Sequence, residues 1–147
     1  HLFQTSKEIT EKYAADGIKA YISVNKALVT QSSAAIPIVP LYISILYKVM
    51  KEKGVHEGCI EQMYRLFAEK FGADGKPVSG AVDGEGRIRL DDLEMKPEIQ
   101  DEVTKLWNIL NADNFKEYTD IEGYWKDFYE LFGFGIDGVD YEADVEV

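Results

Sequence analysis

The chain has 147 residues and a composition that is 46% hydrophobic and 12% aromatic, which excludes a disordered protein and allows one ordinary domain. Its net charge of −11 at pH 7 repels phosphate backbones, so we expect no nucleic-acid partner. The single cysteine, Cys59, excludes an internal disulfide and is typical of a protein from the reducing cytoplasm.

A helix and a strand are the first elements that the pattern predicts. Residues 1–15 place apolar side chains on one helical face, and Asp16-Gly17 is a typical helix end. The next segment, Ile18–Val24, alternates apolar and polar residues and therefore predicts a strand.

Residues 27–47 carry no charge, which calls for a test against a membrane span. The segment opens on the polar run Thr30-Gln31-Ser32-Ser33, and Pro37 and Pro40 interrupt the hydrogen bonds that a span in lipid has to complete internally. We therefore expect a buried helix rather than a membrane span. The helix should begin at Pro40 and end at Gly54.

Three more helices and a glycine-rich segment complete the predicted order. The helix at residues 57–71 should bury an apolar stripe of Ile60, Met63, Tyr64 and Phe67, with Cys59 as an inert packing thiol. Residues 72–92 hold many glycines and predict a linker followed by a short hairpin or an extended arm. Helices are expected at 97–111 and 120–131, and we expect the aromatic segment 131–141 to pack on them.

Two places in the sequence resemble parts of metal sites. Asp83, Glu85 and Asp92 fall on ligand positions of a calcium loop, but Ala81 occupies the opening position, and an Asp-Gly turn between short strands is the better interpretation. His56 and His1 are the only histidines and lack zinc-ligand spacing.

The segment after the first strand is the remaining candidate site. In an open α/β sheet, ligands bind beyond the carboxyl ends of the strands, which is where Leu28, Val29 and Thr30 would lie. Thr30 could hydrogen-bond an amide, and the apolar helix that follows could wall an acyl pocket. On this pattern alone, an ordinary buried strand and helix remains an open alternative.

A longer run of residues around this segment resembles a known family. Residues 24–70 (VNKALVTQSSAAIPIVPLYISILYKVMKEKGVHEGCIEQMYRLFAEK), then GRIRLDDLE, and the ending FYELFGFGIDGVDYEADV are similar to trans-2-enoyl-CoA reductases and the FabV-type enoyl-acyl-carrier-protein reductases. The resemblance covers nearly the whole chain. It implies a reductase that passes hydride from NADH to the double bond of a 2-enoyl thioester in fatty acid synthesis.

The resemblance also implies what this chain lacks. The family's catalytic tyrosine and lysine would fall just upstream of His1, and its glycine-rich nucleotide loop lies further upstream, so no catalytic residue is expected here. Since the sequence begins at His1 without a methionine or signal sequence, we interpret that end as a cut end. We expect the C-terminal part of a longer cytoplasmic enzyme, inactive alone, whose partners are the N-terminal remainder and an enoyl-CoA or enoyl-acyl-carrier-protein substrate.

The resemblance assigns a fold and a few site residues. The fold class is α/β, with residues 1–74 as the C-terminal part of a doubly wound, short-chain-dehydrogenase-like Rossmann fold and 75–147 as a mostly helical extension. Leu28, Val29 and Thr30 correspond to cofactor contacts, and Tyr47 to a position near the acyl pocket. The last seventy or so residues resemble a segment labelled FAD-binding, but they show no flavin pattern, so we expect NADH and not FAD. The rival interpretation is a non-catalytic helical module that binds an acyl chain or a protein through residues 34–49.

Overall fold

The computed structural model describes residues 1–144, and the chain forms two compact units that are each discontinuous in sequence. The first unit contains His1–Ala27 and Glu57–Pro97, and the second contains Leu28–His56 and the chain from Glu98 on. The domain boundary expected between residues 74 and 75 falls inside the first unit.

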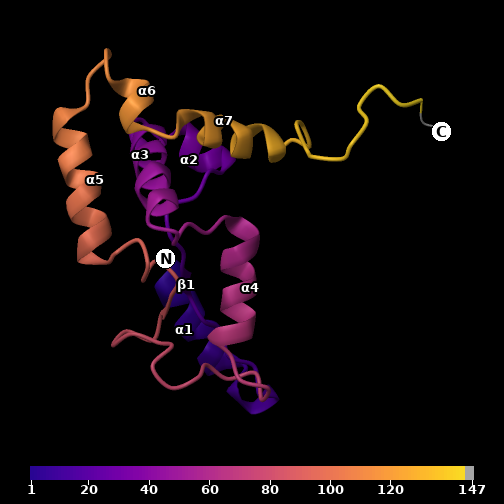
Figure 1. The fold of residues 1–147 in the computed structure, drawn as a ribbon. Helices are drawn as coiled ribbons and strands as arrows, with labels where there is room; N and C mark the ends of the chain where they lie inside the picture. Colours follow the sequence, from indigo (N-terminus) through magenta and orange to yellow (C-terminus); the bar gives the residue numbers. More distant parts are fainter. Residues whose placement is uncertain (145–147) are drawn as a thin grey trace. The chain divides into compact units, whose positions relative to one another are not determined.

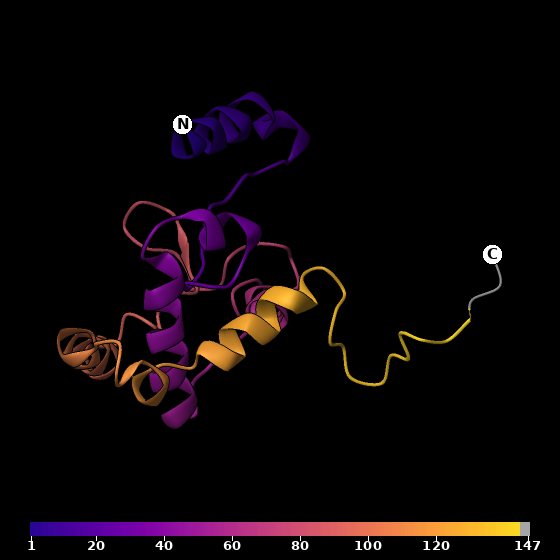
Figure 2. The same ribbon diagram turned by 90° about the horizontal axis from the view of Figure 1, so that it is seen from above.

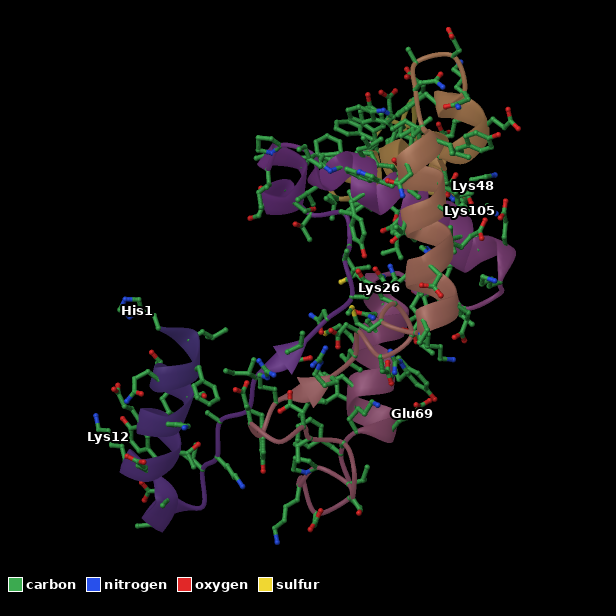
Figure 3. All side chains as sticks on the ribbon, turned by 90° about the vertical axis from the view of Figure 1, so that its left-hand side faces the viewer. His1, Lys12, Lys26, Lys48, Glu69 and Lys105 are labelled. Atoms are coloured by element: carbon green, nitrogen blue, oxygen red, sulfur yellow. The ribbon has the colours of Figure 1, made fainter. Side chains whose placement is uncertain are left out.

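The first unit contains two helices, a short 3-10 turn and two strands. Its N-terminal helix ends at Lys12, and the predicted stop, Gly17, takes a left-handed φ of 74° and closes the 3-10 turn that follows. Figure 3 labels His1 and Lys12 at the two ends of that helix. The elements are α1 (Leu2–Lys12), η1 (Ala14–Asp16), β1 (Ser23–Val24), α4 (Cys59–Glu69) and β2 (Ile88–Arg89).

The first strand is shorter than predicted. Only Ser23–Val24 of the expected strand Ile18–Val24 forms a ladder, and it pairs in parallel with Ile88–Arg89. The Ile88 N–H donates to the Ile22 carbonyl at 2.8 Å. A strand extends only as far as its partner does, and within residues 1–144 this one has a ladder partner on a single edge.

The glycine-rich segment contains a short hairpin, which is one of the two alternatives that the sequence left open. Val82 forms an antiparallel bridge with Ile88, and the Asp83 N–H donates to the Arg87 carbonyl at 2.9 Å. The core beneath it consists of Leu66, Ile88 and Leu90, with partly buried Tyr21, Met63 and Phe71 packed against them.

Helix α4 buries a different face from the one predicted. Ile60, Tyr64 and Phe67 are 77%, 73% and 70% exposed, whereas Gln62, Arg65 and Leu66 are buried. The expected apolar stripe was therefore wrong for Ile60, Tyr64 and Phe67, whereas Met63 is partly buried as predicted. Its polar face meets the end of β2, where Gln62 and Arg65 both bond the Leu90 carbonyl. Cys59 is exposed, so its expected packing role was also wrong.

The second unit is helical and is built around one buried helix (Figure 1). That helix, α3, contains Pro40 in its first turn and is followed by Gly54 at a φ of 67°, as the sequence predicts. Two short helices, α2 and α6, were not predicted, because four or five residues are too few to show a period. The elements are α2 (Gln31–Ala35), α3 (Val39–Glu52), α5 (Pro97–Ile109), α6 (Phe115–Tyr118) and α7 (Ile121–Glu130).

Asp120 ties α7 to α3. Its side chain caps α7 by accepting the Gly123 N–H at 3.2 Å, and its own N–H donates to the Ser44 carbonyl at 2.8 Å. Lys51 of α3 forms an ion pair with the same carboxylate at 2.5 Å. A Cβ on Gly123 would collide with this pair, so the position favours glycine. The core of the unit is Val29, Ile43, Ile45, Leu46, Tyr47, Val49, Met50, Ile99, Val103, Leu106 and Tyr124.

The segment after α7 packs on the helices only at its start, where the ring of Phe132 lies edge-on to that of Phe128, with centroids 5.3 Å apart. Residues 133–144 are exposed, and Figure 2 shows the segment running away from α7, so the expected packing of 131–141 was wrong beyond Phe132. Its turns are stabilised locally, since the Tyr141 hydroxyl donates to the Gly133 carbonyl at 2.7 Å and accepts the Ile136 N–H at 2.8 Å. Within residues 1–144, no helix has the length and apolar character needed to cross a membrane.

Candidate functional site

The three residues predicted to contact the cofactor lead directly into helix α2. Val29 is 6% exposed, whereas Thr30 is exposed and is the N-cap of α2. Thr30 Oγ1 accepts the Ser33 N–H at 3.0 Å, and Ser33 Oγ accepts the Thr30 N–H at 2.8 Å. This reciprocal capping box explains the polar run in an otherwise apolar stretch.

Ser33 also holds the residue at the other end of the segment. Its hydroxyl lies 2.9 Å from the Leu28 carbonyl, close enough to donate a hydrogen bond. One serine therefore bonds both Leu28 and Thr30, and the segment between them has a fixed backbone. A preformed backbone binds a ligand with a smaller loss of conformational entropy.

Tyr47 lies beside this segment. It is 1% exposed on α3, and its hydroxyl accepts the Val29 N–H at 3.4 Å, which is a long hydrogen bond. The pKa of Tyr47 is raised well above its ordinary value of 10.0, first by burial and then by the charge of Asp127, to which its hydroxyl is also hydrogen-bonded. The ring packs edge-on against His56, with centroids 4.4 Å apart.

The structure thus brings Tyr47 to Val29, both of which were predicted as site residues from the sequence. Because Tyr47 is enclosed, its direct effect is to hold the backbone of Val29. The expected contact between Tyr47 and an acyl chain stays a prediction.

Thr30 keeps hydrogen-bonding capacity for a ligand. A hydroxyl oxygen has two acceptor positions, and the Ser33 N–H uses one of them. The other can accept an N–H from a carboxamide, which is the polar group of a nicotinamide ring. The side chain is exposed, so a ligand can reach it. The residues present therefore fit the amide end of NADH.

The candidate calcium residues are occupied by a turn. Asp83 accepts the N–H groups of Arg87 and Glu85 at 3.0 and 2.9 Å, and the Arg87 Nε at 2.8 Å. These bonds, first of all that of the Arg87 N–H, lower the pKa of Asp83 to about 2. Asp92 forms ion pairs with Arg65 and Lys70 instead. The Asp-Gly turn expected from the sequence is confirmed.

A sizeable cavity lies elsewhere, in the first unit. It is formed between α1 and the segments 19–22 and 76–87, and it contains none of the predicted site residues. Lys7, Lys19 and Arg87 lie on its wall together with Glu11 and Glu85. Mixed charges on an open wall give no specific ligand chemistry, so we do not assign the site to this cavity.

Two family models match the chain and together cover most of it. The trans-2-enoyl-CoA reductase catalytic region matches residues 1–71, and the enoyl reductase FAD binding domain matches residues 82–145. The trans-2-enoyl-CoA reductase [NADH] of Ruminiclostridium cellulolyticum is 57% identical over 144 residues, which are 97% of this chain. The chain belongs to the trans-2-enoyl-CoA reductase family.

Further matches are to other reductases. The enoyl-[acyl-carrier-protein] reductase [NADH] of Coxiella burnetii is 55% identical over 100% of the chain. A crystal structure of the Clostridium trans-2-enoyl-CoA reductase in complex with NADH matches 99% of the chain with a TM-score of 0.87 and 49% identity. The Treponema denticola enzyme in complex with NAD gives a TM-score of 0.85 at 45% identity, again over 99% of the chain.

These matches confirm the expected α/β class and the resemblance to the reductase family. The chain spans only about a third of the length of these relatives, 35% of the Ruminiclostridium enzyme and 36% of the Coxiella and Clostridium enzymes. In the part of the chain that the structure describes, the sheet consists of the short parallel pair of β1 and β2.

One of the two family models, which matches residues 82–145, is named for FAD binding. A flavin ring needs an enclosed, mostly apolar cleft. In the described part of this segment, residues 132–144 are exposed, and Trp125 and Tyr129 are 46% and 52% exposed. The expectation that the segment binds no FAD stays a prediction, and we assign no step to FAD.

Proposed function

We propose that the chain is the C-terminal third of an NADH-dependent reductase that saturates the double bond of 2-enoyl thioesters. The observation that supports this most is the rigid segment from Leu28 to Thr30, which has an unused acceptor on Thr30. When bound, NADH supplies the hydride. The thioester is carried by coenzyme A or acyl-carrier protein, and the enzyme works in the cytoplasm.

In this proposal the chain orients the nicotinamide and does not itself perform the proton chemistry. Thr30 Oγ1 accepts the carboxamide N–H, while the backbone of Leu28 and Val29 lies along the ring. The two hydrogen bonds of Ser33 and the one of Tyr47 keep that backbone in place. Positioning of this kind lowers a barrier because the reacting atoms are already aligned.

Tyr47 is proposed to border the acyl pocket, next to the cofactor segment whose backbone it holds. Its hydroxyl contact with Val29 places it next to the proposed cofactor segment. Residues 43–47 of α3 are all buried, so they do not offer the open binding surface that the rival helical-module interpretation requires.

The catalytic groups are proposed to come from the remainder of the enzyme. That remainder is also the partner that we propose for the exposed face of α4, formed by Ile60, Tyr64 and Phe67. Assayed alone with crotonyl-CoA and NADH, residues 1–147 should therefore show no turnover. Robust NADH oxidation by this polypeptide alone would show that the catalytic pair was wrongly assigned to the missing part.

The experiment that tests the cofactor site is Thr30→Val in the complete reductase. Loss of one hydrogen bond between neutral groups costs about 0.5–1.5 kcal/mol, so KM for NADH should rise about twofold to tenfold. Thr30→Ser keeps the hydroxyl and should stay near wild type. Both values come from initial rates at varied NADH.

A matched control separates the helix cap from the cofactor contact. Ser33→Ala removes the capping partner but leaves the Thr30 hydroxyl, so it should lower the melting temperature and change KM for NADH less than Thr30→Val does. If Thr30→Val altered only the preference for acyl-chain length, the cofactor would not lie on this segment.

A further inference from the structure

Two successive backbone N–H groups just beyond β1 are held by side chains rather than by a strand. The Lys26 N–H donates to Gln62 Oε1 at 3.2 Å, and the Ala27 N–H donates to Glu94 Oε2 at 2.7 Å. Gln62 is fully buried and Glu94 is 7% exposed. Figure 3 labels Lys26 at this point of the chain.

Gln62 is itself fixed by the elements around it. Its Nε2 donates to the Leu90 carbonyl at 3.1 Å and to Glu57 Oε2 at 3.3 Å. Leu90 directly follows β2, as Asn25 follows β1. The side chain of Gln62 therefore bridges the backbones of both strands where their ladder stops, and α4 sets the position of the bridge.

Burying a primary amide and a carboxylate is costly unless their hydrogen bonds are made, and apolar side chains would fill the same space at lower cost. What the two polar groups add is a defined direction for the chain as it leaves β1. Ala27 is joined by one peptide bond to Leu28, the first residue of the proposed cofactor segment.

We propose that Gln62 and Glu94 are positioning residues for NADH binding, acting through the backbone of Lys26 and Ala27. The inference rests on the proposed function of Leu28, Val29 and Thr30. It assigns the buried polar face of α4 a role in the reaction that the helix pattern did not predict. Neither residue contacts the cofactor itself.

Helix α4 also supplies a control for this proposal. Arg65 is 9% exposed, one turn from Gln62, and it bonds the Leu90 carbonyl at 2.7 Å and forms ion pairs with Glu57 and Asp92. None of these bonds goes to Lys26 or Ala27. Replacing Arg65 therefore disturbs the same buried network without releasing the two N–H groups.

The experiment compares Gln62→Met with Arg65→Met in the complete reductase. Gln62→Met keeps the length of the side chain and removes the amide, so KM for NADH should rise about threefold to tenfold, with kcat at saturating NADH within about twofold of wild type. Arg65→Met should lower the melting temperature and leave KM for NADH within about twofold. An equal rise of KM in both variants would reduce Gln62 to a structural role and overturn the proposal.

A second test replaces Glu94 either by a residue that keeps the acceptor or by one that removes it. Glu94→Gln retains an acceptor for the Ala27 N–H and should stay closer to the wild-type KM than Glu94→Met, which removes the acceptor. This pair decides the question if Gln62→Met fails to fold. A Glu94→Met enzyme that folds with an unchanged KM for NADH overturns the proposal.

The wild-type enzyme distinguishes this inference from its premise. If the complete protein does not reduce enoyl thioesters with NADH, the proposed function fails and the positioning role fails with it. If it does reduce them, and Thr30→Val raises KM for NADH but Gln62→Met does not, the cofactor site stands and only the role of Gln62 and Glu94 is overturned.

Discussion

Helices α3 and α4 are both amphipathic in sequence, yet they differ in how much of their apolar face is buried. Residues Ile43–Tyr47 of α3 are all buried, and the helix is packed against α7 through Asp120 and Lys51. In α4, Ile60, Tyr64 and Phe67 are exposed, whereas Gln62, Arg65 and Leu66 are buried. Helix α3 finds its partners within residues 28–144, whereas α4 packs Leu66 and part of Met63 against Ile88 and Leu90 and leaves the rest of its apolar face exposed. Periodicity thus identifies a face but not what covers it.

The largest effect is expected in the core of α3. Leu46 is fully buried, so Leu46→Ala should lower the free energy of unfolding by about 2–5 kcal/mol, through lost transfer energy and a residual cavity. Urea unfolding of the chain, followed by circular dichroism, measures the change. Ile60→Ala on α4 is the matched control and should change this free energy by less than about 0.5 kcal/mol. Equal losses at both sites would contradict the difference between the two helices.

A smaller effect is expected at Tyr47, the polar member of the α3 core. Tyr47→Phe leaves the buried Val29 N–H without its acceptor and should lower the free energy of unfolding by about 1–3 kcal/mol. Tyr47→Ala should in addition change the dependence of the complete enzyme on acyl-chain length. If Tyr47→Phe costs nothing in thermal unfolding, the hydroxyl does not hold Val29.

Because the pKa of Tyr47 is raised, the stability that its buried hydroxyl contributes should depend on pH. Because the folded-state pKa lies above the ordinary value of 10.0, the stabilisation is complete below about pH 10 and declines as the pH rises beyond it. The wild-type melting temperature should therefore fall more steeply between pH 9 and 11 than that of Tyr47→Phe. Parallel curves for the two proteins would contradict a protonated, buried Tyr47. Tyr124, whose pKa is also raised by burial, titrates equally in both.

The smallest effect on stability is expected on the exposed face of α4. In the isolated chain, Tyr64→Ser with Phe67→Ser should change the free energy of unfolding by less than about 0.5 kcal/mol per site, while lowering self-association and the binding of a hydrophobic dye. Trp125→Ser, at a 46% exposed aromatic residue of α7, is the control and should lower dye binding less. In the complete enzyme, the amides of α4 should exchange hydrogen more slowly than in the isolated chain if the remainder covers this face.

The sequence by itself determined the local structure and the family. Gly17 closes the 3-10 turn after α1, Gly54 follows the end of α3, Pro40 lies in the first turn of α3, and Asp83 forms the expected turn. These features depend on residues within one or two turns of each other, so a local pattern is sufficient. The long run of family-like residues added the reductase assignment, which composition and spacing alone left open.

Only the tertiary structure decided which faces are buried and how the candidate site is supported. Strand β1 has two residues instead of seven because a ladder requires a partner, and residues 132–144 remain exposed despite their aromatic content. The bonds from Tyr47 to Val29 and from Gln62 to Lys26 join residues 18 and 36 positions apart. No local period encodes such a contact, because burial of a side chain depends on which distant segment covers it.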